Sequence, residues 1–166
     1  MSKFKKQNVL FLLFFIILLS GCEKDSLYDD APKVLNKKKL LELVNNYRQK
    51  GCNCGSTYFP PAKPLVWNDL LESAAQVHSN DMNKNDFFSH TGSNGKTVGY
   101  RITSVGYNWS ACGENIAMGY KTEDDVMLGW IHSEGHCKNI MNPDFKEMGV
   151  ATSGAYWTQV FGKRKE

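Results

Sequence analysis

Hydrophobic positions repeat with a helical period in the first half of the chain. Leu40, Val44 and Tyr47 recur at i, i+4 and i+7, which places them on one face of a helix. Helix signals begin at Asn36, and Gly51 is a stop signal at the C-terminal end. The pattern therefore predicts an amphipathic helix between these two residues.

Three more helices are predicted further along the chain. The first runs from a cap at Asn68 to about Lys84. Its inward face comprises Leu71, Ala74, Ala75, His78 and Met82. Because His78 lies on this apolar face, we expect it to pack in the core rather than bind a ligand. A short helix is predicted over residues 98–105, and a long one follows Thr122, whose hydroxyl can cap it.

The C-terminal part changes to a period of two. Met148, Val150 and Thr152 alternate, as do Tyr156, Thr158 and Val160, with Gly154 between the two runs. This pattern predicts an antiparallel hairpin, and residues 115–120 supply a further strand. Residues 52–66, which hold two cysteines and three prolines, are predicted to be an ordered loop. Helices followed by a small antiparallel sheet indicate an α+β layered domain.

An apolar run near the N-terminus has the features of a bacterial lipoprotein signal. Three lysines precede residues 9–19, which are uninterruptedly apolar, and Ser20-Gly21 lead into Cys22. A membrane-spanning helix needs roughly 20 apolar residues, so the run is too short to cross a bilayer. We expect cleavage after residue 21 and lipidation of Cys22; the alternatives are an uncleaved anchor or an ordinary secretory signal with Cys22 free.

These features divide the chain into four parts. Residues 1–21 are the predicted lipoprotein signal, residues 22–35 a polar tether, residues 36–162 the domain and residues 163–166 a tail. The predicted location is the bacterial cell envelope, outside the cytoplasm, with the domain attached to a membrane by the lipid at Cys22.

Charge excludes one class of partner. Three of the 20 basic residues and none of the 17 acidic residues lie in residues 1–21, which leaves 17 of each in the rest of the chain. A neutral domain gives no electrostatic reason to expect nucleic acid as a partner.

Four cysteines remain after Cys22: Cys52, Cys54, Cys112 and Cys137. Outside the cytoplasm, an even number indicates two disulfides. A bridge between Cys52 and Cys54 would close a very tight loop, so we favour bridges from these two to Cys112 and Cys137, with the pairing open. A zinc site is the alternative, although Cys-x-Cys is not the usual ligand spacing.

Four short stretches concentrate the polar residues. They are Phe-Ser-His at 88–90, Gly-Glu-Asn-Ile-Ala at 113–117, Trp-Ile-His-Ser-Glu-Gly-His-Cys-Lys-Asn-Ile at 130–140, and Tyr-Trp-Thr-Gln-Val-Phe-Gly at 156–162. Together these stretches resemble the CAP superfamily of cysteine-rich secretory proteins, insect venom antigens and plant pathogenesis-related proteins, and in particular its bacterial SCP-like extracellular branch. The resemblance implies a three-layer α-β-α sandwich with a small central antiparallel sheet and a shallow cavity.

The resemblance also implies a site. In the family the cavity is typically lined by two histidines and two glutamates, and some members bind zinc or another divalent cation there. His90 matches the first histidine and Glu114 matches one glutamate. Ser133 and Tyr156 stand where the second glutamate and second histidine belong. Bacterial members commonly carry a Ser-x-Gly-His turn, here residues 133–136, so His136 is expected to complete the site.

Glu134 stands where bacterial relatives usually carry proline. It is either an extra ligand lining the cavity or an exposed charge.

Three functions remain open for these residues. Binding of an envelope polymer, a lipid or a protein is favoured over turnover. The second is a metal-assisted, peptidase-like hydrolase, in which His90, His136 and Glu114 are catalytic candidates and hold a divalent cation that activates water. The third is a structural cavity without a ligand, in which the buried polar groups satisfy one another.

Overall fold

The computed structural model describes residues 34–166. The predicted signal, the lipidation at Cys22 and nearly all of the predicted tether lie outside the described residues, so these remain predictions.

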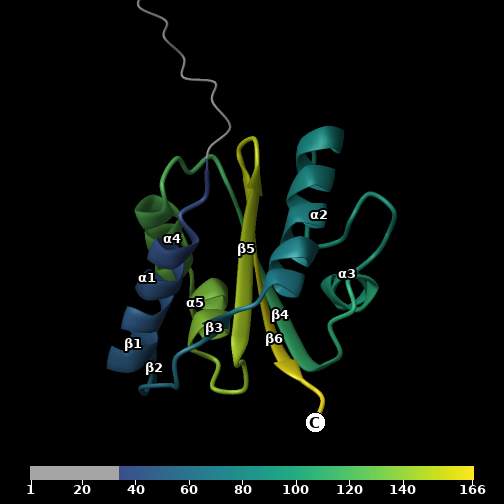
Figure 1. Ribbon diagram of the computed structural model, residues 1–166. Coiled ribbons are helices and arrows are strands. Elements are labelled where there is room, and N and C mark those ends of the chain that lie inside the picture. The colour runs from purple at the N-terminus through teal and green to yellow at the C-terminus, as the bar shows by residue number, and fades with distance from the viewer. Residues whose placement is uncertain (1–33) are drawn as a thin grey trace, which may run out of the picture. The chain divides into compact units, whose positions relative to one another are not determined.

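A four-stranded sheet separates two layers of helices (Figure 1). The strand order is β3 (Val66–Trp67), β5 (Glu147–Ser153), β6 (Tyr156–Arg164) and β4 (Trp109–Met118). Helices α1 (Lys37–Lys50), α4 (Glu123–His132) and α5 (Glu134–Met141) cover one face, and α2 (Asp69–Asn85) and α3 (Val98–Ser104) cover the other. The predicted α+β class and the three layers are confirmed.

Pairing within the sheet is antiparallel for β5, β6 and β4, as predicted. The exception is β3, which is only two residues long and pairs parallel to β5. It joins the sheet through a hydrogen bond in which Val66 N–H donates to Lys146 O at 3.1 Å. A strand of two residues is too short to show an alternating pattern in the sequence.

The helices that were predicted to begin after Asn36, Asn68 and Thr122 are capped by these residues. Asn36 accepts a hydrogen bond from Lys39 N–H, and Thr122 accepts one from Asp125 N–H. Asn68 accepts from both Leu70 and Leu71. Each cap satisfies a backbone donor that the first helical turn leaves without a partner.

Two further segments differ from the prediction. The segment predicted as a loop contains a hairpin of β1 (Cys52–Cys54) and β2 (Thr57–Phe59), which turns at Gly55 with φ of 61°. Three-residue strands are too short for an alternating pattern. The helix α5 was also missed; it has eight residues and contains Gly135, so packing rather than helix propensity stabilises it.

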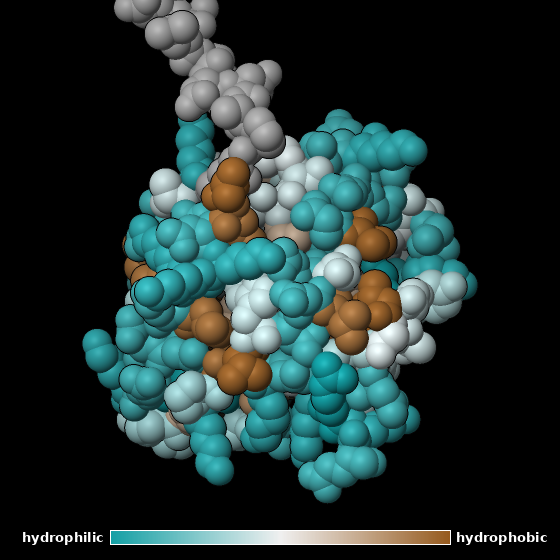
Figure 2. Space-filling model, viewed as in Figure 1, coloured by the Kyte–Doolittle hydropathy of each residue, from teal (hydrophilic) through white to brown (hydrophobic). Residues whose placement is uncertain are grey.

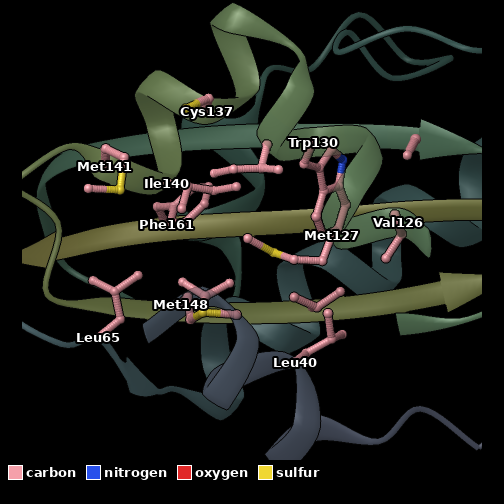
Figure 3. Packing of buried hydrophobic residues seen from close by; sticks show 14 of the residues in the cluster. Leu40, Leu65, Val126, Met127, Trp130, Cys137, Ile140, Met141, Met148 and Phe161 are labelled. Carbon is pink, nitrogen blue, oxygen red and sulfur yellow. The ribbon is translucent and has the colours of Figure 1, made fainter. Parts of the chain in front are cut away.

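The two faces of the sheet bury separate apolar clusters. Figure 3 shows the larger one, in which Trp130, Ile140, Leu40 and Phe161 meet between α1, α4, α5 and the sheet. Val160, the neighbour of Phe161, packs in the other cluster, beneath α2 and α3. Successive side chains of a strand point to opposite faces, so both faces of β6 are core. Residues 156–162 of β6 are therefore all buried, including the polar Thr158 and Gln159.

Close approach of α2 to the sheet requires a glycine. A Cβ atom at Gly149 of β5 would lie 2.1 Å from the backbone nitrogen of Glu72. This distance is far inside van der Waals contact, so any side chain there would push α2 from the sheet.

Arg48 of α1 is fully buried and binds backbone groups. Its guanidinium donates to the carbonyls of Lys63, Ile140, Asn142 and Phe145. Burial lowers the pKa of Arg48 to about 10, so the group is still charged at neutral pH. This one side chain thus fixes the segment before β3 and the end of α5.

Candidate functional site

Glu114 on β4 lies at the centre of a buried charge network. Its side chain is 2% exposed. Oε2 accepts a hydrogen bond from Arg101 Nη2 at 2.6 Å, and Oε1 accepts one from His90 Nδ1 at 2.8 Å. Both carboxylate oxygens are therefore engaged with donors, as a buried carboxylate requires.

His90 lies where this network reaches the surface. Its side chain is 57% exposed and belongs to the segment between α2 and α3. Since a carboxylate oxygen accepts the hydrogen bond at Nδ1, that nitrogen carries the proton. The other ring nitrogen, Nε2, is then available to a ligand.

Arg101 was missed by the sequence prediction. It donates to the carbonyls of Lys96 and His90 as well as to Glu114. The signal was present in the sequence, because Arg101 lies at i+3 from Val98, on the same helix face as Ile102. A charged residue on an apolar face indicates a buried partner of opposite charge.

His78 was expected in the core and is fully buried there. Its Nε2 donates to Ser89 O at 2.8 Å and lies 3.9 Å from Glu114 Oε1. Among the described residues its Nδ1 has no hydrogen-bond partner. Burial is the main cause that lowers the pKa of His78; Arg101 lowers it further, and Glu114 opposes the shift. His78 is thus a neutral support beneath the segment that carries His90.

The neighbour of Glu114 points to the opposite helical layer. Asn115 Nδ2 donates to His136 O at 3.2 Å and to Gln159 Oε1 at 3.0 Å. Asn139 of α5 donates to Asn115 Oδ1 and to Glu114 O. These two amides are structural hydrogen bonders, and they fasten α5 to β4.

His136 is therefore fixed beside the same strand from the other side. Its pKa is lowered, first by burial and then by an electrostatic contribution from His90. The structure thus joins His90 directly to Glu114, and it places the backbone of His136 against Asn115, the next residue of β4.

Strand β4 is an edge of the sheet, yet side chains cover part of its backbone. The carbonyl of Glu114 accepts from Asn139, and that of Ile116 accepts from Trp130 Nε1 at 3.4 Å. Such bonds protect an edge strand from pairing with another chain. A groove lies between this edge of the sheet and α4.

This groove is a cavity of about 330 Å³. Its lining is mainly apolar, with Ser133 and His136 as the polar members: Phe88, Ile116, Ala117, Met118, Tyr120, Gly129, Trp130, Ser133 and His136. We call it the β4 groove.

Two residues predicted to line the cavity lie elsewhere. Tyr156 is buried on β6 and donates its hydroxyl to Asp86 Oδ1 at 3.1 Å. Glu134 is exposed and pairs with Lys138 one helical turn away, at 2.5 Å. For Glu134 the geometry favours the exposed-charge alternative.

The disulfide prediction is half right. Cys54 and Cys137 are bridged and fully buried. Cys52 and Cys112 are free. Cys112 packs with the α2–α3 cluster, whereas Cys52 packs with the cluster on the other face of the sheet, so the second predicted bridge is wrong because the sheet separates the two thiols.

One cluster of sulfur atoms has metal-site dimensions. Within residues 34–166, the ligand atoms of Cys52, Cys54 and Cys137 all lie within 4.8 Å of one another. Since thiolates are the metal-binding form of cysteine, the bridge between Cys54 and Cys137 occupies two of the three ligands.

The family of the chain follows from comparison with known proteins. The family model for CAP, the cysteine-rich secretory protein family, matches residues 41–161. The chain belongs to the CAP family. The motifs that resembled this family thus indicated it correctly.

Two Bacillus subtilis relatives support this assignment. The uncharacterized protein YkwD is 36% identical over 143 residues, which cover 84% of this chain and 52% of YkwD. The uncharacterized membrane protein YlbC is 32% identical over 129 residues, which cover 78% of this chain and 35% of YlbC. The chain thus spans about half or less of the length of these relatives.

Solved structures share the fold. An extracellular protein containing an SCP domain from Bacillus anthracis matches with a TM-score of 0.69 and 31% identity, covering 78% of this chain and 40% of that one. An outer surface protein from Borrelia burgdorferi has a TM-score of 0.66 at 24% identity, covering 77% and 92%. The second similarity concerns the fold alone.

Proposed function

We propose that this CAP domain binds an amphipathic lipid outside the cytoplasm. The observation that carries the proposal is a concentration of exposed apolar side chains. Phe88, Met118 and Tyr120 are 49%, 51% and 37% exposed, and all three line the β4 groove. Exposed apolar side chains that gather in one concave surface are typical of a binding site.

On the face shown in Figure 2, hydrophobic residues form small patches separated by hydrophilic ones. Isolated patches of this kind are normal on a folded protein. The β4 groove differs because apolar side chains and the polar His136 converge there.

The histidines define the head group that we expect. A neutral His90 accepts a hydrogen bond at Nε2, and a protonated His90 donates one. A hydroxyl group can serve either state, because it both donates and accepts. We therefore infer a ligand with an apolar chain in the groove and a hydroxyl near His90 and His136.

The engagement of Glu114 favours binding over turnover. A general base must have a lone pair within reach of the proton that it abstracts. Both oxygens of Glu114 already accept strong hydrogen bonds, and the group lies beneath His90. Its role in this proposal is to orient His90.

Attachment to a membrane remains part of the proposal. The N-terminal pattern of residues 1–22 predicts a lipid at Cys22, and the Bacillus anthracis protein of similar structure is extracellular. Within residues 34–166, no helix is long and apolar enough to cross a bilayer. A lipid-tethered domain would hold the β4 groove near membrane lipids.

The test is calorimetric titration of residues 33–166 with 1-octanoylglycerol below its micelle concentration. We expect saturable one-to-one binding that Met118→Glu weakens by about tenfold or more, since a charge would enter an apolar groove. The matched control is Val77→Glu, which changes a similarly exposed aliphatic residue on α2 and should bind normally. Equal binding by both variants, or no binding by a folded parent, contradicts the proposal.

A second candidate is a divalent metal site. The hydrogen bond from His90 Nδ1 to Glu114 is the arrangement in which a carboxylate orients a metal-binding imidazole. His90 and His136 would hold the ion, and Glu114 would support His90. A bound ion of this kind can activate water for hydrolysis.

Calorimetric zinc titration separates this candidate from the first. Tight one-to-one binding that is lost in His90→Ala would establish the metal site and justify a search for chelator-sensitive hydrolysis. If the folded parent binds no zinc, the metal-assisted hydrolase is excluded. A domain that binds neither zinc nor lipid would have a purely structural cavity.

A further inference from the structure

The free thiol of Cys52 lies against the only disulfide among the described residues. Cys52 Sγ is 3.7 Å from Cys137 Sγ, which is bonded to Cys54. This separation is van der Waals contact between two sulfur atoms. The thiol is therefore beside the atom that it would attack in thiol–disulfide exchange.

The local fold explains why the three sulfurs converge. Cys52 and Cys54 are two residues apart on β1, so their side chains project to the same face of that strand. Cys137 lies on α5, which packs against this strand. One cysteine of the helix thus faces two cysteines of the strand.

The two possible bridges are nearly equivalent for the unfolded chain. The existing bridge joins residues 83 apart, and a bridge between Cys52 and Cys137 would join residues 85 apart. Loop-closure entropy depends only weakly on length, so it does not discriminate between the two. Local packing alone decides which bridge is populated.

Burial differs among the three residues. Cys54 and Cys137 are fully buried, whereas Cys52 is partly exposed. Cys112 packs beneath the other face of the sheet and cannot take part. Cys52 is thus the thiol of this cluster that reagents and bases in solution can reach.

We propose that Cys52, Cys54 and Cys137 form a thiol–disulfide exchange site in which the bridge moves between Cys54–Cys137 and Cys52–Cys137. The Cys52 thiol loses its proton to solvent, and its thiolate attacks Cys137 Sγ. The new S–S bond forms as the bond to Cys54 breaks, and Cys54 leaves as a thiolate that takes up a proton. No external oxidant or reductant is consumed.

The environment of Cys52 sets the pH at which exchange is fast. Burial raises the pKa of the Cys52 thiol. Since only the thiolate attacks, exchange accelerates as pH rises toward that raised pKa.

The test uses the full chain with Cys22→Ser in mild detergent, which removes the one cysteine outside residues 34–166. The oxidised protein is incubated at a pH near the ordinary thiol pKa of about 8.5, and exchange is stopped by acidification. The protein is then unfolded in the presence of N-ethylmaleimide, which alkylates the free thiols. Peptides from acid proteolysis then show by mass spectrometry which cysteines are linked. We expect Cys52–Cys137 peptides to appear with time as a minor fraction, on the order of 1–10%.

Two variants make the result decisive. Cys54→Ser is the positive control, in which mild oxidation should form Cys52–Cys137 almost completely; Cys52→Ser must yield only Cys54–Cys137. If the parent yields no Cys52–Cys137 peptide while Cys54→Ser shows that the peptide is detectable, the exchange site is refuted. It is also refuted if Cys54→Ser cannot form the bridge, because the sulfurs then do not meet.

Discussion

The two helical layers contact the same sheet, but their buried arginines have different kinds of partner. In the layer of α2 and α3, Arg101 pairs with Glu114, and the network continues to the exposed ring of His90. In the layer of α1, α4 and α5, the buried Arg48 donates to backbone carbonyls that lie within the fold. Both arrangements pair a buried guanidinium with oxygen acceptors, yet only the first reaches solvent.

This difference separates a candidate site from a structural fastening. When all the partners of a buried charge lie inside the fold, the charge only holds loops in place. Its loss should therefore affect stability alone. A buried charge that orients an exposed imidazole also affects how tightly that imidazole binds a ligand. The comparison therefore predicts large losses of stability in one layer and smaller losses, joined to changes in binding, in the other.

Replacement of Arg48 should have the largest effect. Arg48→Met fills similar space but leaves four backbone carbonyls without their donor. We expect the free energy of unfolding to fall by about 3–5 kcal/mol, measured by urea denaturation at neutral pH. Binding by the remaining folded protein should be unchanged. A loss below about 1 kcal/mol would show that the carbonyls find other partners.

Loss of the disulfide should have the second largest effect on stability, and the size of the loss should depend on which of its two cysteines is replaced. Cys137→Ser removes the sulfur common to both possible bridges and should cost about 2–4 kcal/mol. Cys54→Ser should cost less after oxidation, because Cys52 can take over the bridge. Urea denaturation of both oxidised variants measures the difference, and Cys112→Ser serves as the control. Equal losses at the two ends would mean that Cys52 does not substitute.

In the other layer, Glu114→Gln should have a moderate effect. The amide can accept from one donor but removes the charge that balances Arg101, so we expect a loss of about 1–3 kcal/mol. Because one amide oxygen cannot replace two carboxylate oxygens, the ring of His90 should be held less firmly, and ligand or zinc affinity should also fall. The control is Glu134→Gln, whose exposed pair with Lys138 should contribute less than about 1 kcal/mol. Unchanged affinity in a destabilised Glu114→Gln variant would make the network purely structural.

The smallest effect concerns pH. Burial lowers the pKa of His78 below its ordinary value of 6.5. The unfolded chain therefore takes up this proton more readily than the folded one, so stability falls as pH drops below about 6.5. The nearby groups Glu114, Arg101 and Asp81 also act on this pKa.

Comparison with His78→Gln isolates this contribution. The glutamine can still donate to Ser89 O but does not titrate. Between about pH 7 and about pH 5, the free energy of unfolding should change more steeply with pH in the parent than in His78→Gln. The difference corresponds to the uptake of at most about one proton on unfolding. Identical slopes in urea series for the two proteins would show that His78 does not titrate on unfolding.

Local sequence signals determined most of the secondary structure. The caps at Asn36, Asn68 and Thr122 satisfy neighbouring backbone donors, and the alternation around Gly154 produces the hairpin of β5 and β6. Such features depend on residues within one or two turns, so they can be read without a fold. The motifs also singled out His90 and Glu114, which are joined by a hydrogen bond.

Only the tertiary structure decided which long-range partners these residues have. Neither the charge of Arg101 nor its place on a short helix specifies Glu114 on another strand as its partner. The pairing of Cys54 with Cys137, rather than Cys52, depends on which sulfur of β1 lies nearest α5. The helix α5 itself is too short to form without packing. Contacts between distant segments are set by the shared burial of whole elements, and that information is spread over the entire chain.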